Sequence, residues 1–182
     1  MEKRLFLAIL LPGKIKEGLI KVQKEQKKLN ICWTKKENLH FTLLFLGKIE
    51  QEKIEKIKKA LKKVAKNTFP FYIEIKKIVP GPSKEKPRMI WAKGSLNEKI
   101  INLRKDIINS FKEEKIEFKN DHKFNLHITL ARARKKELHE RKIEQNLNLI
   151  FPVKEFFLME SELKKEGPKY IINSRFKLKG RD

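Results

Sequence analysis

One four-residue pattern occurs twice in this chain of 182 residues, and it restricts the fold more than any other feature. It reads His-Phe-Thr-Leu at residues 40–43 and His-Ile-Thr-Leu at residues 127–130. The chain contains only 4 histidines and four threonines, so two such matches would arise by chance about three times in a thousand. Each copy lies within an apolar run of the length expected for a buried strand. The sequence therefore predicts two related halves, each of which places one histidine on a strand.

The apolar residues outside these motifs predict further strands and helices along the chain. Strands are expected at residues 4–11, 31–34, 40–46, 71–75, 88–92, 125–131, 151–163 and 170–178. Helices are expected at residues 15–29, 54–67 and 96–111, with a weaker and very polar candidate at residues 135–147. Proline and glycine make residues 80–87 the clearest loop. The order resembles an internal duplication without a flexible linker, so we expect residues 1–182 to form a single domain of two lobes.

The chain is strongly basic, because 45 Lys and Arg residues outnumber 23 Asp and Glu residues and give a formal net charge of +22. A charge of this size attracts polyanions, and nucleic acid is the obvious one. It is equally compatible with the lysine-rich surfaces found in thermophiles. The charge therefore indicates a polyanion as a candidate partner but specifies no chemistry.

The single cysteine, Cys32, excludes an intramolecular disulfide and is typical of a reducing cytoplasm. It lies beside Trp33 in a short apolar stretch, which indicates a thiol in the core. The apolar run at residues 5–11 is too short to cross a bilayer, and no small-residue cleavage site follows it. We therefore expect a cytoplasmic protein that does not associate with membranes.

The spacing within each motif has a geometric consequence. Side chains of a strand alternate between its two faces, so His40 and Thr42 point the same way, about 6.5 to 7 Å apart. The same holds for His127 and Thr129. The intervening apolar residues face the other side and anchor each strand in its lobe; they are Phe41, Leu43 and Phe45 in one motif and Leu126, Ile128 and Leu130 in the other. If the two strands face each other, two imidazoles and two hydroxyls meet in one small volume.

Cleavage of a phosphodiester uses this set of groups. A neutral imidazole removes a proton from the attacking water, and an imidazolium donates a proton to the departing oxygen. The threonine hydroxyls can donate hydrogen bonds to phosphate oxygens where charge builds up. A lone histidine on an apolar strand is usually a core residue, but two in matching motifs favour catalysis.

A zinc site is disfavoured because neither motif has a cysteine or third histidine at ligand spacing. The other two histidines, His122 and His139, lack the pattern and are expected at the surface.

The two halves differ five residues after each motif histidine, where Phe45 and Arg132 stand. The planar guanidinium of Arg132 matches phosphate oxygens. Simple alternation would turn Arg132 away from His127, so contact with a shared phosphate requires a bend near Ala131. The alternative is a solvated arginine beside Arg134 at the end of the strand.

The flanking segments extend the similarity to a known family. Beyond the motifs, they are residues 4–12, 33, 39–47, 87–91, 124–132, 160–163, 167 and 170. With these residues the chain resembles the RNA 2′,3′-cyclic phosphodiesterases of bacteria and archaea, which belong to the two-histidine phosphoesterase superfamily and were historically called 2′-5′ RNA ligases. One departure is Leu126, where family members usually carry proline.

The resemblance implies an α+β fold with two pseudo-symmetric lobes, each an antiparallel sheet with helices on the outside, enclosing a central active-site cleft. It implies that His40 donates a proton to the leaving 3′ oxygen and that His127 activates water. It implies that Thr42, Thr129 and Arg132 bind the phosphate, without metal or cofactor, and that the product carries a 2′-phosphate.

Several alternatives stay open at this point. The substrates implied are RNA with 2′,3′-cyclic phosphate ends, including tRNA fragments, or small cyclic nucleotides. The same site could join RNA ends through a 2′-5′ linkage, or the chain could be a non-catalytic basic RNA-binding module. Phe45, Arg88 and Trp91 are candidate contacts to the base beside the phosphate, although Phe45 and Trp91 could equally be core residues. We expect a monomer.

Overall fold

The computed structural model describes residues 1–26, 31–118, 124–133, 138, 143–165 and 167–180. The helices are α1 (Gly13–Glu25), α2 (Ile54–Asn67) and α3 (Glu98–Glu113). The strands are β1 (Glu2–Leu10), β2 (Cys32–Trp33), β3 (His40–Glu50), β4 (Phe71–Gly81), β5 (Met89–Gly94), β6 (His127–Arg132), β7 (Gln145–Val153), β8 (Glu155–Lys164) and β9 (Gly167–Lys177). Two short 3-10 turns, η1 (Lys36–Asn38) and η2 (Gln51–Lys53), precede β3 and α2.

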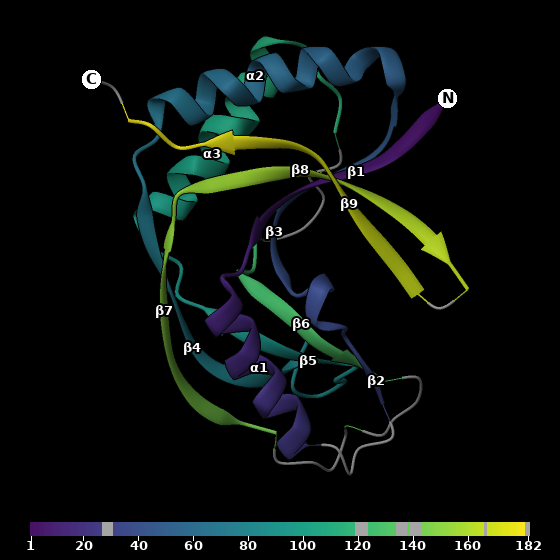
Figure 1. The fold of residues 1–182 in the computed structure, drawn as a ribbon, viewed down its shortest axis with the longest axis vertical. Coiled ribbons are helices and arrows are strands. Elements are labelled where there is room, and N and C mark those ends of the chain that lie inside the picture. The colour runs from purple at the N-terminus through teal and green to yellow at the C-terminus, as the bar shows by residue number, and fades with distance from the viewer. Residues whose placement is uncertain (27–30, 119–123, 134–137, 139–142, 166, 181–182) are drawn as a thin grey trace.

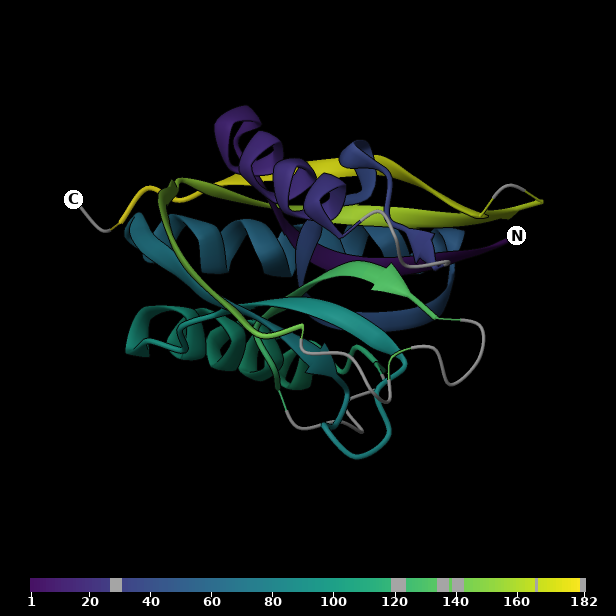
Figure 2. The same cartoon turned by 90° about the horizontal axis from the view of Figure 1, so that it is seen from below.

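The strands form two antiparallel sheets, one in each lobe (Figure 1). The first sheet has the order β3-β1-β8-β9, and the second has the order β2-β6-β5-β4-β7. Figure 2, viewed from below, separates the strands β8 and β9 of the first sheet from β4, β5 and β6 of the second. The α+β fold with two antiparallel lobes is therefore confirmed.

The lobes do not coincide with the two halves of the sequence. The short strand β2, from the first half, pairs with β6 in the second sheet. The last two strands, β8 and β9, return to the first sheet, where β8 pairs with β1. Each lobe is therefore completed by a segment from the other half, which ties the two lobes together.

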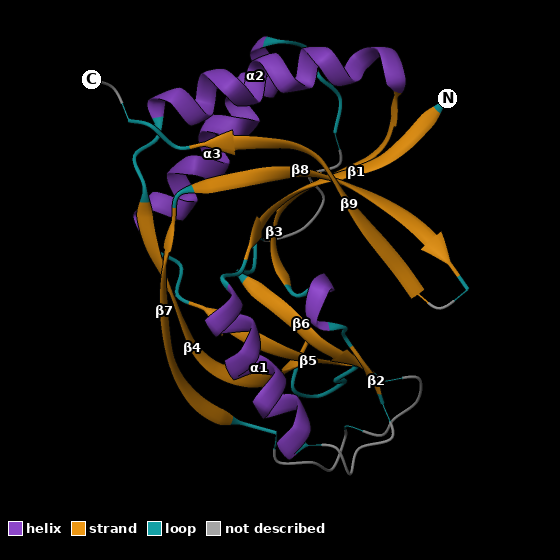
Figure 3. Cartoon of the chain, in the orientation of Figure 1, coloured by secondary structure: helices purple, strands orange, loops and turns teal. Residues whose placement is uncertain are grey.

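The helices occupy different parts of the molecule (Figure 3). Helices α2 and α3 contact each other, and α2 also contacts β9 of the first sheet. Helix α1 lies against the second sheet, because Gln23 donates hydrogen bonds from Nε2 to the carbonyl oxygens of Thr34 and Leu130, both at 3.0 Å. No helix within the described segments is both long and apolar enough to cross a bilayer.

Strand β1 of the first sheet is buried on both faces, as its continuous apolar run predicts. Leu5, Leu7 and Ile9 belong to the main core. Phe6 and Ala8 point the other way, into a small second cluster completed by residues 157 and 159 of β8. This second cluster forms the floor on which the first motif histidine rests.

Two expectations about secondary structure are corrected. The polar helix expected at residues 135–147 conflicts with β7, which begins at Gln145; residues 134–137 and 139–142 lie outside the described segments. Leu147, Leu149 and Phe151 alternate with the exposed Asn148 and Ile150, so this strand has one inward face, a pattern hidden by its three asparagine and glutamine residues. The single strand expected at residues 151–163 is two strands separated at Lys154.

The expectation of a core thiol at Cys32 is also wrong. Its side chain is exposed. The reason is its position on β2, a two-residue strand at the edge of the second sheet with a neighbour on one side only. An apolar stretch of this length does not distinguish an edge strand from a buried one.

Candidate active site

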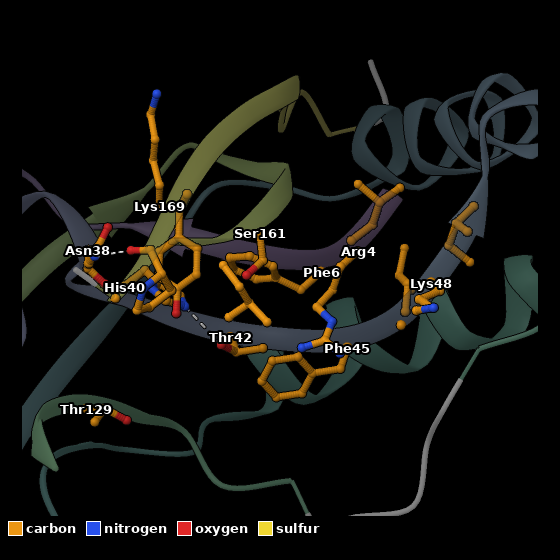
Figure 4. Close-up of a pocket in the computed structure, with 18 of the residues that line it drawn as sticks. Arg4, Phe6, Asn38, His40, Thr42, Phe45, Lys48, Thr129, Ser161 and Lys169 are labelled. Carbon is orange, nitrogen blue, oxygen red and sulfur yellow. Dashed lines mark hydrogen bonds between the residues drawn. The ribbon is translucent and has the colours of Figure 1, made fainter. Parts of the chain in front are cut away.

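Both motif strands face one cleft between the lobes. β3 of the first sheet contacts β6 of the second, and the cleft is lined by His40, Thr42, Phe45, Met89, Trp91, His127, Thr129, Arg132 and Tyr170 among others. Its volume is about 2230 Å³. Ligand pockets for small molecules usually measure about 300–1,000 Å³, so the cleft has room for more than one nucleotide. Figure 4 shows Thr42 beside His40 on one wall and Thr129 on the opposite wall.

A β-bulge in β3 determines which side chains enter the cleft. Residues 42 and 44 pair with the adjacent residues 8 and 7 of β1, so Leu43 is an extra residue in the strand. An extra residue interrupts the alternation of faces. As a result Phe45 points into the cleft beside His40, with 60% of its surface exposed. The expectation that Phe45 lies on the opposite face, and the alternative that it is a core residue, are both wrong.

The equivalent bulge in β6 acts on the other wall. Residues 129 and 131 pair with the adjacent residues 91 and 90 of β5, so Leu130 is the extra residue. Leu130 and Ala131 are then both buried, and the following residue, Arg132, turns back toward the cleft that His127 faces. The strand thus contains the change of direction near Ala131 on which a role for Arg132 depends.

The imidazole of His40 is held at both nitrogens. Nδ1 donates a hydrogen bond to the carbonyl oxygen of Asn38 at 2.7 Å, and Nε2 lies 3.1 Å from Oγ1 of Thr42. Because a carbonyl oxygen only accepts, Nδ1 carries the hydrogen and neutral His40 presents the lone pair of Nε2 to the cleft. The ring rests on Phe6, with centroids 5.2 Å apart, and on the edge of Tyr170 at 5.1 Å.

His127 has the matching arrangement on the second sheet. Its Nδ1 donates to the carbonyl oxygen of Asn125 at 2.9 Å, which fixes the same tautomer. Its ring stacks on the indole of Trp91, with centroids 3.9 Å apart and planes inclined by 26°. Each histidine therefore directs Nε2 away from its own carbonyl partner while aromatic rings support the imidazole.

Burial and positive charge lower the pKa of both imidazoles, which favours their neutral forms. For His40, burial is the main cause of a lowered pKa, and the charges of His127, Lys16 and Arg132 lower the pKa further. For His127, burial again lowers the pKa most, followed by the charge of Arg132. The backbone hydrogen bond to each ring opposes these effects. Both rings line the same cleft.

Arg132 supplies the positive charge at the centre of the cleft. Its guanidinium adds to the burial that lowers the pKa of His40 and His127, and it opposes the burial that raises the pKa of Tyr170. Its Nη1 donates to Sδ of Met89 at 3.4 Å. Among the ion pairs of the described segments none involves Arg132, so its charge is available to an anion.

The three residues predicted to contact the base lie in different surroundings. Phe45 stands exposed in the cleft, and Trp91 lines it but is only 8% exposed because His127 covers its ring. Arg88 is exposed and does not line the cleft. Its backbone is used instead, since its N–H donates to Gly81 and its carbonyl oxygen accepts from Ala133. The structure therefore places Arg88 outside the lining of the cleft, and its contact with the base stays a prediction.

The repeat is longer than the sequence prediction recognised. Both copies read Asn-Leu-His-x-Thr-Leu, at residues 38–43 and 125–130, and the two asparagines provide the carbonyl oxygens that orient the histidines. Asn38 also donates from Nδ2 to the carbonyl oxygen of Pro168 at 2.9 Å, which fixes the β8–β9 hairpin beside the site. The Asn-Leu pair that precedes both histidines was the sequence signal that could have revealed this longer repeat. Met89 and Tyr170 were missed as site residues because neither belongs to the repeat.

In the part of the chain that the structure describes, no three His, Cys, Asp or Glu side chains are grouped as a metal ion would require. His122 and His139, which were expected at the surface, lie outside the described segments.

Comparisons with known proteins agree with this geometry. The model of the LigT-like phosphoesterase family matches residues 9–91 and 93–170. The RNA 2′,3′-cyclic phosphodiesterase of Methanocaldococcus jannaschii is 33% identical over 176 residues, covering 93% of this chain and 97% of that relative. The enzyme of the same name from Archaeoglobus fulgidus is 31% identical over 173 residues, covering 92% and 96%. A crystal structure of a protein from Thermus thermophilus superposes with a TM-score of 0.88 at 29% identity, covering 98% of this chain and all of that one.

Proposed function

This chain belongs to the LigT-like phosphoesterase family, and from that premise we propose that it hydrolyses RNA 2′,3′-cyclic phosphate ends to 2′-phosphates without a metal ion. The observation that carries the proposal is the pair of oriented imidazoles, each with a lowered pKa, in one cleft that Arg132 also lines. Because both lobes contribute to this site, residues 1–182 act as one catalytic domain.

The proposed reaction uses the two histidines in opposite protonation states. Nε2 of His127 accepts a proton from water, whose oxygen forms a new bond to phosphorus. The bond from phosphorus to the ribose 3′ oxygen breaks, and Nε2–H of His40 protonates that oxygen. The product carries a 2′-phosphate and a 3′-hydroxyl, and proton exchange with solvent restores the two histidines.

His40 must gain a proton before it can act as the acid. In the free protein burial, followed by the positive charges of Lys16 and Arg132, lowers the pKa of His40 and opposes this. The cyclic phosphate is an anion, and its arrival offsets these positive charges, which raises the pKa of the adjacent imidazole. We therefore propose that substrate binding and protonation of His40 are coupled.

Three further side chains stabilise the phosphate in this proposal. Thr42 and Thr129 extend from opposite walls, and Arg132 provides a planar pair of N–H donors. Such donors act where negative charge builds up on the non-bridging oxygens in the transition state. When His40 is protonated, its Nε2–H can leave the hydroxyl of Thr42 and point to the substrate, and the hydroxyl is then free to donate to a phosphate oxygen.

The cleft also suggests how the rest of the RNA is held. The exposed ring of Phe45 provides a stacking surface for the base beside the phosphate. Trp91 does not serve this purpose, because His127 occupies its face. Arg4, Lys48 and Lys169 lie around the same cleft (Figure 4), and the cleft exceeds the volume that one nucleotide needs. These features favour an oligonucleotide, such as a tRNA fragment, over a small cyclic nucleotide.

The test is hydrolysis of an oligonucleotide with a 2′,3′-cyclic phosphate end, in EDTA, by the wild type and by His40→Ala and His127→Ala. Each variant is expected to lose about 10²- to 10⁴-fold in kcat, the usual contribution of a general acid or base. Thr68→Val is a control, because Thr68 bonds to the backbone of Val64 away from the cleft. Full activity of either histidine variant would refute the mechanism.

The same assay separates the other functions. A ligase would consume added RNA with a 5′-hydroxyl and form a 2′-5′ linkage faster than it hydrolyses the end. A non-catalytic RNA-binding module would bind cyclic and non-cyclic ends equally and would be unaffected by His40→Ala.

A further inference from the structure

The thioether of Met89 lies between two groups that the reaction uses. Met89 stands opposite Arg132 in the β5–β6 pairing, and its Sδ accepts hydrogen bonds from Nη1 of Arg132 and from Nε1 of Trp91, each at 3.4 Å. Trp91 in turn stacks on His127. One sulfur atom is therefore in contact with the phosphate-binding arginine and with the ring that supports the general base.

The bond to Trp91 matters because the indole is otherwise enclosed. An indole N–H can only donate, and Trp91 is 8% exposed. Sulfur is a weak acceptor, yet an enclosed N–H that loses its acceptor costs more than the bond itself contributes. The indole also packs closely on Gly81, where a Cβ would approach to 2.4 Å from Cδ2 of Trp91. Trp91 is thus held by close packing on Gly81, by stacking on His127, and at its nitrogen by Met89.

The chemical nature of the acceptor matters for Arg132. A carboxylate in this position would orient the guanidinium but would neutralise its charge, and an anionic substrate would then have to displace it. A thioether is neutral, so it can restrain Nη1 while the remaining N–H groups and the full positive charge face the cleft. Within the described segments no acidic side chain is paired with Arg132, which is consistent with this arrangement.

We propose that Met89 is a positioning residue, whose neutral sulfur holds Trp91 against His127 and aims Arg132 at the phosphate. The proposal rests on the proposed function, since it assigns Met89 a part in that reaction. It goes further because Met89 lies outside the repeated motif and touches neither the attacking water nor the leaving oxygen. A side chain that only fills space would not need an acceptor atom at this point.

Three substitutions of similar length separate these views. Met89→Leu keeps the apolar volume but removes the acceptor, and we expect kcat/KM to fall about three- to tenfold. Met89→Gln restores a neutral acceptor and is expected to recover activity. Met89→Glu offers a charged acceptor that pairs with Arg132, so KM should rise and the acid limb of the pH profile should move to higher pH, because a carboxylate raises the pKa of a nearby imidazole.

A second measurement keeps the test independent of activity. The indole N–H resonance of Trp91 is followed by NMR, with Trp33 as an internal reference. In Met89→Leu it should exchange faster with solvent, and in Met89→Gln it should return to slow exchange. If the wild type hydrolyses the substrate and Met89→Leu has the same kcat/KM and the same indole N–H exchange rate, the role of Met89 is refuted while the proposed function stands. If the wild type is inactive, the proposed function fails, and the exchange data still decide whether Met89 holds Trp91.

Discussion

Gly81→Ala tests from a distance whether Trp91 positions His127. A Cβ at residue 81 would lie 2.4, 2.6 and 2.7 Å from three ring atoms of Trp91, whereas ordinary contacts begin near 3.4 Å. The indole must therefore move by about 1 Å. The indole also stacks on His127, with ring centroids 3.9 Å apart, so this movement disturbs that stack.

The expected effects follow from this displacement. A shift of about 1 Å at a reacting group typically costs on the order of 10²-fold in rate, so kcat should fall by about that factor. Crowding of a packed site typically costs about 1–3 kcal/mol, so the melting temperature should also fall. The assay is steady-state hydrolysis of a cyclic-phosphate-ended oligonucleotide, together with thermal unfolding.

Gly13→Ala is the matched control, because a Cβ at residue 13 meets nothing within 4 Å. It lies at the start of α1 and should leave both rate and melting temperature unchanged or slightly raised. If Gly81→Ala hydrolyses its substrate at the wild-type rate, then His127 does not depend on the position of Trp91.

Three further outcomes are expected. Both motif histidines have a lowered pKa in the folded protein, mainly through burial, so the unfolded chain binds more protons near pH 6. Their contribution to stability is therefore complete above the unfolded pKa of 6.5 and decreases as the pH falls below it. Thermal unfolding between pH 5 and 8 measures this, and a melting temperature that does not change with pH would contradict the burial. Thr42→Val should lower kcat/KM about tenfold by removing one donor to the phosphate, whereas Thr68→Val should not, and equal rates would exclude that donor. Phe45→Ala should raise KM for oligonucleotides without moving the pH profile, and Phe69→Ala, equally exposed but outside the cleft, should leave KM unchanged; identical KM values would exclude stacking on Phe45.

The sequence predicted most of what places the histidines. Hydrophobic periodicity located α2 at the observed residues, and it found β1, β3 and β6 within a few residues. The pairing of the two motifs predicted the two-lobed fold. These features depend on local residue patterns, which a single sequence records directly.

What the sequence did not predict depends on pairing between distant strands. The extra residues Leu43 and Leu130 become bulges only because β1 and β5 pair on either side of them, and no local signal marks them. The alternation of strand faces alone therefore placed Phe45 on the wrong face. It also turned Arg132 away from the cleft unless the strand bends near Ala131. The exchange of β2 and β8–β9 between the lobes is likewise a property of the assembled sheets.

The central claim is that His40 protonates the leaving oxygen while His127 activates water, and a change of leaving group tests it most directly. In a substrate whose ribose 3′ oxygen is replaced by sulfur, the departing thiolate needs no proton. We expect His40→Ala to be slow on the oxygen substrate, by about 10²- to 10⁴-fold, and close to wild type on the sulfur substrate, whereas His127→Ala should be slow on both. Equal impairment of His40→Ala on the two substrates, or recovery of His127→Ala on the sulfur substrate, would contradict these roles.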